Sequence, residues 1–364
     1  MLLKKIEGFT VLTLVMVLTI ILFSCDMNDI NDTDNDIEST LPEEQLVEME
    51  RNPDEGFYWD YLIYIPDTLT ENSADYSDHM LVIPNNTGYP TDNYEEHYES
   101  AKQKVEDNKL YNYVARELGV PVLIPVFPRP STIEEAPKHG SHYYTHALDR
   151  NTMKLDVEEY KRLDRQLINM IDHGHEFLEN QDLKLKEQIL MWGFSAQGSF
   201  INRFTMLHPE KIQAAAYGGF SAIMLPIEER EDSEGEIRNL IYPVGISDLQ
   251  EISDKEFNLE AYKNIPQYIT RGKKDANDHL PNEDKKIKQL IIEVFETEPA
   301  EGDTLDDAKL VLNRYKFAKE VYNEEGIQAQ FDFYEGLEHE ISEEMMQNMI
   351  EFLKKNAGDE LNEI

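Results

Sequence analysis

The chain has 364 residues, of which 40% are hydrophobic and 29% are charged, so it is long enough to bury one large core or two smaller ones. Its 73 acidic and 34 basic residues give a formal net charge of −39. Because such a surface repels the phosphates of nucleic acids, we exclude nucleic acid as a partner. The single cysteine excludes an intrachain disulfide and a cysteine-rich zinc site.

The first 24 residues have the pattern of a targeting segment. Lys4 and Lys5 precede an apolar run over residues 9–23, which is short for a membrane-spanning helix but fits a signal peptide. The run ends in Leu22-Phe23-Ser24-Cys25, which resembles the lipobox of bacterial lipoproteins. The resemblance implies that residues 1–24 are a lipoprotein signal peptide and that Cys25 carries the lipid, palmitate included, that anchors the exported protein to a membrane of the cell envelope. An uncleaved anchor helix is the alternative.

Residues 25–55 are expected to form an acidic, disordered linker between this anchor and a folded domain. The stretch from Asp26 to Asp36 consists mainly of Asp and Asn without helix or strand periodicity, so it cannot bury enough apolar surface to fold. Repulsion between its carboxylates should keep the linker extended, with a reach of roughly 90 Å over its length. The linker would therefore act as a tether.

Residues 56–357 alternate strand-like and helix-like patterns and are expected to form one domain of the α/β class. Apolar runs predict strands at 57–65, 80–84, 121–127, 189–192, 212–217, 265–270 and 329–334. Amphipathic spacing predicts helices at 94–118, 157–171, 200–207, 306–323 and 342–355. This alternation indicates a mostly parallel sheet with helices on both faces. Residues 221–264 are longer than a connection needs, so we expect them to form a cap insertion.

The segment Gly193-Phe194-Ser195-Ala196-Gln197-Gly198 contains a G-x-S-x-G motif between a predicted strand and a predicted helix. A nucleophile elbow requires this context, because its serine sits in a strained turn where side chains at 193 and 198 would collide with neighbouring elements. The turn would lift the Ser195 hydroxyl out of the sheet, with the amide N–H of Ala196 beside it to stabilise an oxyanion. A glycine-flanked turn with a capping serine is the alternative.

Two further residues follow the ends of the last two predicted strands. Asp275 comes directly behind the sixth strand, and His339 comes directly behind the seventh. Because parallel strands end at one edge of a sheet, both side chains are expected near Ser195. There the histidine would take the serine proton, and the carboxylate would orient the histidine. Asp278, three residues beyond Asp275, is the alternative acid.

The order of serine, acid and histidine, each after a strand, resembles that of the α/β-hydrolases over residues 56–357. Three segments make the chain similar to a poorly characterised group of bacterial hydrolases, some esterase-like and some polyhydroxybutyrate-depolymerase-like: 84–88, 144–150 and 272–278. The resemblance implies that backbone N–H groups near Asn86 and Thr87 complete the oxyanion hole with Ala196. The resemblance also implies that the reaction needs no cofactor. Many members carry His-Gly where this chain has Asn-Asn-Thr-Gly, which opens a side-chain role for Asn86.

The sequence therefore predicts a serine hydrolase that cleaves carboxylic esters, small or polymeric, through an acyl-enzyme intermediate. The alternatives are a peptidase or amidase of the same fold and a binding lipoprotein without turnover. Three histidines, His139, His142 and His146, have metal-like spacing in one loop, but we interpret them as residues of the pocket rim and predict no metal site. The sequence does not determine the acyl and alcohol specificity or the oligomeric state.

Overall fold

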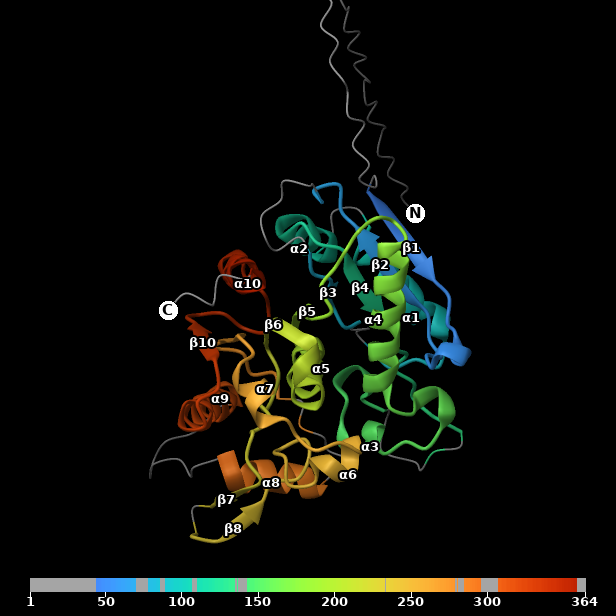
Figure 1. Cartoon of the computed structure of the whole chain (residues 1–364). Coiled ribbons are helices and arrows are strands. Elements are labelled where there is room, and N and C mark those ends of the chain that lie inside the picture. The colour runs from blue at the N-terminus through green and yellow to red at the C-terminus, as the bar shows by residue number, and fades with distance from the viewer. Residues whose placement is uncertain are drawn as a thin grey trace, which may run out of the picture. The chain divides into compact units, whose positions relative to one another are not determined.

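A mixed sheet of eight strands runs through the part of the chain that the structure describes (Figure 1). The structure is a computed structural model, and it describes residues 44–69, 78–85, 89–106, 110–134, 136, 143–232, 234–278, 280, 285–295 and 307–358. The predicted signal peptide, Cys25 and most of the predicted linker lie outside these residues. In the described part, no helix is long and apolar enough to cross a membrane.

The strands follow the order β1-β2-β4-β3-β5-β6-β9-β10 across the sheet. Only β2 runs antiparallel to its neighbours β1 and β4 among these described strands, and the other pairs are parallel. The exchange of β3 and β4 in this order is that of the α/β-hydrolase fold, which confirms the predicted fold class. The strands are β1 (Gln45–Met49), β2 (Tyr61–Ile65), β3 (Leu81–Val82), β4 (Val122–Pro125), β5 (Ile189–Phe194), β6 (Ile212–Gly218), β9 (Gln267–Gly272) and β10 (Ala329–Tyr334).

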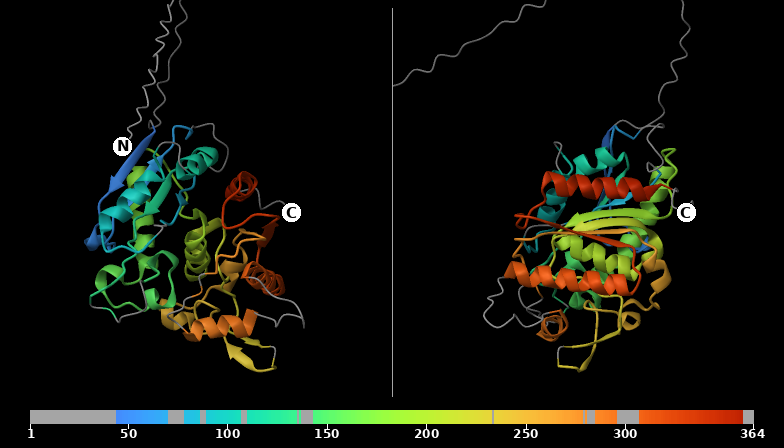
Figure 2. Two further views of the ribbon diagram at one scale, coloured as in Figure 1. Left: turned by 180° about the vertical axis from the view of Figure 1, so that it is seen from behind. Right: turned by 90° about the vertical axis from the view of Figure 1, so that its left-hand side faces the viewer.

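Helices cover both faces of this sheet, as the right-hand view of Figure 2 shows for α10 on one side and α5 and α9 on the other. Side chains alternate between the two faces along a strand, so Tyr61, Ile63 and Ile65 of β2 join one core and Leu62 and Tyr64 join the other. The helices are α1 (Tyr94–Gln103), α2 (Leu110–Leu118), α3 (Arg150–Met153), α4 (Leu163–Glu179), α5 (Ala196–Leu207), α6 (Leu249–Ser253), α7 (Leu259–Lys263), α8 (Lys285–Phe295), α9 (Asp307–Glu324) and α10 (Glu343–Ala357).

The sheet begins earlier in the chain than the sequence analysis expects. Strand β1 lies at Gln45–Met49, inside the range assigned to a disordered linker, and pairs with β2 from Gln45↔Ile65 to Met49↔Tyr61. An edge strand is held mainly by its main-chain hydrogen bonds and needs little apolar alternation, so its pattern is weak in the sequence. The linker boundary at residue 55 is therefore wrong, because the folded part already includes β1.

Other boundaries also differ from the prediction. The single helix expected at 94–118 is two helices, α1 and α2, and the helix expected at 157–171 begins at Leu163 and continues to Glu179. Helix α8 was not predicted, although Ile287, Leu290, Ile291 and Val294 follow helical spacing and are buried. A turn within a continuous apolar pattern changes the sequence little. The ends of helices and strands are therefore harder to predict than the elements themselves.

The long connection between β6 and β9 carries four short elements. They are the hairpin of β7 (Glu229–Glu231) and β8 (Ile237–Asn239), followed by α6 and α7. Figure 1 shows β7, β8 and α6 beside α8, on the side of the sheet where α3 also lies. In the described residues, the connection between β6 and β9 thus has secondary structure of its own, and α8 lies next to it.

Candidate active site

Ser195 occupies the turn between β5 and α5. Its backbone has φ 64° and ψ −126°, a strained conformation for a residue that is not glycine, and its N–H donates to Gly218 O at 2.8 Å. The flanking glycines are sterically required. A Cβ at Gly193 would lie 2.6 Å from Gln197 Cβ, and a Cβ at Gly198 would lie 2.5 Å from Gly218 O. The strand, the turn and the helix pack so closely that neither position has room for a side chain. The two glycines therefore allow the elbow to form.

His339 lies between Ser195 and Asp275. Its Nε2 is 3.0 Å from Ser195 Oγ, and its Nδ1 is 3.0 Å from Asp275 Oδ2. The Asp275 side chain is fully buried, whereas 30% of the His339 side chain is exposed. The imidazole packs beside the ring of Phe194, with 5.1 Å between the ring centroids. The structure thus brings together the three residues that the sequence analysis singled out, in the order needed for proton transfer from serine to histidine.

Arg271 supports the loop that carries the acid. Its guanidinium donates to the carbonyl oxygens of Phe220, Asp275 and Asn277 at 2.8, 2.8 and 3.1 Å, and it lies 3.2 Å from Asp275 Oδ1. The same Oδ1 accepts a hydrogen bond from Asn277 N at 2.9 Å. Sequence reasoning assigned no role to Arg271. Its position in a strand whose other side chains are uncharged was the available indication.

The loops after β9 and β10 are also joined to each other. Lys273 N donates to Tyr334 O and Lys274 N donates to Leu337 O, both at 2.9 Å. These bonds extend the pairing of the two parallel strands into the loops, so Asp275 and His339 are positioned by one hydrogen-bonded unit.

Asp278, the alternative acid, lies elsewhere. Its two carboxylate oxygens accept from Nη1 and Nη2 of Arg314 at 2.8 and 3.0 Å. The Arg314 side chain on α9 is 1% exposed, so this fork-like pair ties the acid loop to a buried cation. The geometry therefore favours Asp275 over Asp278 as the partner of His339.

The first residue of α5, Ala196, directly follows the serine, and its N–H is one of the helix N-terminal donors that the helix itself leaves unused. Asn86 and Thr87, expected to supply the second oxyanion donor, lie outside the described residues. The loop that leads to them is tied to the elbow by Gln197, whose Nε2 donates to Pro84 O and to the Tyr111 hydroxyl, both at 2.5 Å. Sequence reasoning assigned no role to Gln197, which here links β3, α2 and the elbow.

A cavity of about 310 Å³ opens beside the serine. Its large apolar lining residues come from the segment after β6, the loop after β9 and α8, and most of its polar ones come from the elbow, α5 and residues 129–149. The lining residues are Arg129, Tyr144, His146, Ala147, Asp149, Ser195, Ala196, Ser199, Arg203, Gly219, Phe220, Ser221, Ala222, Pro243, Asn277, Leu280, Ile287 and Ile291. Such a volume suits a small ligand or one arm of a larger one.

The histidine loop is described only in part, since His139 and His142 lie outside the described residues. His146 is buried and lines the cavity, with its ring stacked on Tyr144 at 5.6 Å. Within the described ranges, no group of three His, Cys, Asp or Glu side chains is arranged to hold a metal ion.

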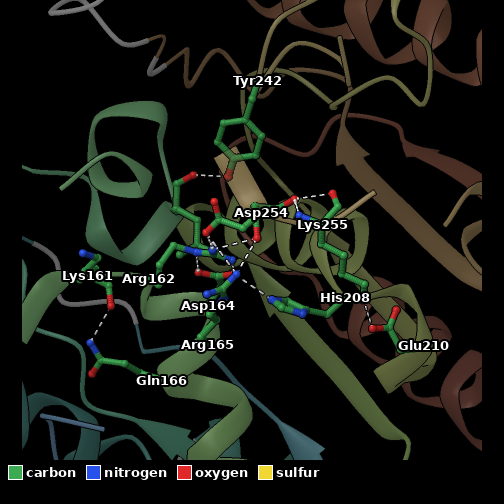
Figure 3. A network of polar contacts seen from close by, with 12 residues as sticks. Lys161, Arg162, Asp164, Arg165, Gln166, His208, Glu210, Tyr242, Asp254 and Lys255 are labelled. Atoms are coloured by element: carbon green, nitrogen blue, oxygen red, sulfur yellow. Dashed lines mark hydrogen bonds and ion pairs between the residues drawn. The ribbon is translucent and has the colours of Figure 1, made fainter. Parts of the chain in front are cut away.

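A second buried carboxylate, away from the serine, also meets an arginine and a histidine (Figure 3). Arg162 donates from Nε and Nη2 to Asp164 at 2.8 and 2.6 Å, and His208 Nε2 lies 2.8 Å from Asp164 Oδ2. Burial alone would raise the pKa of Asp164, but the hydrogen bonds from Arg162 and His208 outweigh it and hold this pKa well below its ordinary value. The network extends to Asp254, which pairs with Arg162 and Arg165, both at 3.3 Å.

No protein-family model and no curated protein matches the sequence. Among solved structures, the chain is similar to poly(aspartic acid) hydrolase-1 from Sphingomonas sp. KT-1, at 15% identity and a TM-score of 0.47, over 86% of this chain and 98% of that one. It is similar to FphF, a fluorophosphonate-binding serine hydrolase of Staphylococcus aureus, at 12% identity and a TM-score of 0.46, over 87% and 100%. For an S-formylglutathione hydrolase from Agrobacterium tumefaciens the values are 12%, 0.44, 86% and 94%.

The assignment of the fold rests on this chain's own strand order and on the turn that carries Ser195. The eight strands follow the α/β-hydrolase order, and the serine stands on a strained turn between the fifth of them and a helix. This protein therefore has the α/β-hydrolase fold.

Proposed function

We propose that this protein is a serine hydrolase that cleaves carboxylic esters through an acyl-enzyme intermediate. The observation that carries the proposal is the position of His339, whose two ring nitrogens each lie 3.0 Å from a partner, Ser195 Oγ on one side and Asp275 Oδ2 on the other. A histidine fixed in this way can accept the serine proton while the carboxylate selects its tautomer and stabilises the imidazolium.

In the proposed reaction, Ser195 Oγ attacks the acyl carbon as His339 Nε2 takes its proton. The negative charge that develops on the carbonyl oxygen is stabilised by the N–H of Ala196, with N–H groups of Asn86 and Thr87 as the second donors. His339 then gives the proton to the leaving alcohol. A water molecule, deprotonated by the same histidine, attacks the acyl-enzyme and releases the acid. No step requires a cofactor.

A fluorophosphonate probe tests this proposal directly. The protein comprising residues 26–364 should be labelled at Ser195, and Ser195→Ala should lose the label and roughly 10⁴- to 10⁶-fold in kcat. Labelling of the Ala variant at the same rate would refute the role of Ser195. A protein that folds but neither reacts with the probe nor turns over an ester would favour the binding lipoprotein without turnover.

Ester and amide substrates separate the two enzymatic alternatives. The attack on an amide needs the same three residues, but the amine leaves only when it is protonated, so amide hydrolysis makes a greater demand on His339. A panel of 4-nitrophenyl esters set against aminoacyl 4-nitroanilides measures the preference. We expect kcat/KM to favour the esters, and the reverse order would establish a peptidase or amidase.

We further propose that the protein is exported and held at a membrane by lipid on Cys25. The supporting observation is the sequence Leu22-Phe23-Ser24-Cys25, which ends an apolar run and contains the chain's only cysteine. The mature protein should enter the detergent phase and gain the mass of acyl chains, and Cys25→Ala should accumulate as an unprocessed precursor. A mature N-terminus elsewhere, with Cys25 unmodified, would refute the anchor.

A further inference from the structure

One face of α5 forms a polar stripe along the cavity beside Ser195. Ser195, Ser199 and Arg203 are spaced four residues apart, which places them above one another on one side of a helix, and all three line the cavity. The proposed nucleophile, a second hydroxyl and a guanidinium thus follow one another along the same wall.

The guanidinium of Arg203 has few partners. Among the described residues, its one hydrogen-bond acceptor is the carbonyl oxygen of Ala147, and no carboxylate lies within ion-pair distance. A guanidinium has five N–H donors and stays protonated in proteins, so donors of Arg203 remain for a ligand in the cavity that this residue lines. Burial lowers the pKa of the Arg203 guanidinium, because its charge is held away from water. An anion in the cavity would relieve this cost.

The rest of the polar lining sets the charge that the cavity accepts. Arg129 also lines it and lies 5.7 Å from the centroid of the Tyr144 ring. Asp149 is the acidic lining residue, and one of its carboxylate oxygens accepts from Thr152 N as the cap of α3. Among the described lining residues, two arginines against one aspartate leave a small positive excess in a protein whose net charge is −39. That balance suits a single carboxylate better than a doubly charged phosphate.

The cavity also has large apolar lining residues. Phe220, Leu280, Ile287 and Ile291 line it, and they would cover methylene groups between the serine and the guanidinium. Eight helical residues span roughly 12 Å along the axis, and the Arg203 side chain leans toward the helix N-terminus, so the remaining gap is shorter. An acyl chain of about four to eight carbons fits that gap.

We propose that the cavity is an acyl pocket for esters whose acyl chain ends in a carboxylate, and that Arg203 binds this carboxylate. The inference rests on the proposed esterase function and adds the substrate class. Because Arg203 holds a group that does not change during the reaction, its bond should stabilise substrate and transition state equally. Loss of Arg203 should therefore act mainly on KM.

Pairs of esters with equal chain length test the proposal. The 4-nitrophenyl monoesters of adipic and suberic acid are compared with 4-nitrophenyl hexanoate and octanoate. The wild-type protein should prefer the charged member of each pair, and Arg203→Gln should lower the charged-to-neutral ratio of kcat/KM by about ten- to a hundredfold, the worth of a charge-assisted hydrogen bond. Arg203→Lys should recover part of that ratio, because it keeps the charge and loses the planar fork.

A matched control removes an arginine elsewhere. Arg230 lies on β7, pairs with Glu324 and is not part of the cavity lining, so Arg230→Gln should keep the wild-type ratio. An unchanged ratio in Arg203→Gln would overturn the proposal and leave the esterase function standing. A preference for charge on the leaving group, measured with 4-carboxyphenyl hexanoate, would overturn the acyl assignment.

Direct binding separates a failure of the inference from a failure of the proposed function. Calorimetry with adipate on Ser195→Ala needs no turnover, so it tests the anion site even if neither ester is hydrolysed. Binding to Ser195→Ala that is lost when Arg203→Gln is added would support the site. No binding to Ser195→Ala would overturn it.

Discussion

Two buried aspartates of this protein, Asp164 and Asp275, each contact an arginine and a histidine. The two groups differ in which acceptors the N–H groups of the arginine bind. Arg162 donates twice to the carboxylate of Asp164, so that carboxylate is already neutralised when His208 reaches it. All three side chains are thereby tied together, and the group holds α4 against the residues that follow α5 and α6.

At the other aspartate, the arginine mainly binds the main chain. Arg271 donates to three carbonyl oxygens, and one carboxylate oxygen of Asp275 is left for His339. The second nitrogen of His339 then faces Ser195 at the edge of a cavity. Asp164, Arg162 and His208 thus form a structural clamp in which the arginine binds the carboxylate twice. At Asp275 the arginine contacts one carboxylate oxygen and holds the loop, and His339 links the other oxygen to the proposed nucleophile.

Removing each histidine is the strongest way to separate the two groups. His339→Ala should lower kcat on the order of 10⁵-fold, since His339 Nε2 is the group proposed to take the proton of Ser195 Oγ. His208→Ala should change kcat by less than threefold and lower the stability instead. Steady-state rates with a 4-nitrophenyl ester and urea unfolding of both variants make the comparison. A catalytic loss in His208→Ala equal to that in His339→Ala would abolish the distinction.

Removing the charge of the acid comes next in size. Asp275→Asn should cost about 10⁴-fold in kcat, because the amide lets His339 adopt the wrong tautomer. Asp278→Asn should cost no more than about tenfold, with some loss of stability because the buried Arg314 loses the charge of one ion-pair partner. Both are measured on folded protein at neutral pH, and the reverse order would transfer the acid role to Asp278.

A substitution in the clamp should lower the stability of the protein and leave the rate of ester hydrolysis unchanged. Asp164→Asn removes the fully buried partner of a largely buried ion pair, at a cost of about 3 kcal/mol in the free energy of unfolding. The folded variant should keep its kcat because Asp164 does not contact Ser195, His339 or Asp275. Chemical denaturation and ester turnover of one preparation give both numbers, and unchanged stability would show that the network contributes little.

The smallest expected effect is the pH dependence of the stability that Asp164 contributes to the clamp. The pKa of Asp164 lies below its unfolded value of about 3.9, so its contribution to stability is complete above that pH and is lost as the pH falls toward the lowered folded pKa. The difference in unfolding free energy between wild type and Asp164→Asn should therefore shrink as the pH falls below about 4. A difference that grows below this pH would contradict this sign.

The sequence allowed the proposed reacting residues to be predicted because their positions are bound to local patterns. Gly193 and Gly198 mark the elbow, and Asp275 and His339 directly follow apolar strands. The supporting residues could not be found in this way. Three such residues, Arg271, Gln197 and Arg203, contact segments that are distant in the sequence. Contacts of this kind produce no recognisable pattern of residue spacing.

The same contrast applies to the fold. Buried strands and long amphipathic helices were predicted from their periodicity, whereas β1 was assigned to the linker and α8 was missed. Strand β1 depends on main-chain pairing with β2, which no side-chain pattern records. Helix α8 was detectable from its apolar spacing, because Ile287, Leu290, Ile291 and Val294 recur at helical intervals.

The hydrogen bonds between the loops after β9 and β10 have a mechanical consequence. They join Lys273 to Tyr334 and Lys274 to Leu337, so Asp275 and His339 should move as one rigid body. The alignment of Ser195, His339 and Asp275 then depends on the distance between that rigid body and the turn that carries Ser195. Loosening at this edge of the sheet should first lengthen the gap between serine and histidine, while the imidazole keeps its carboxylate.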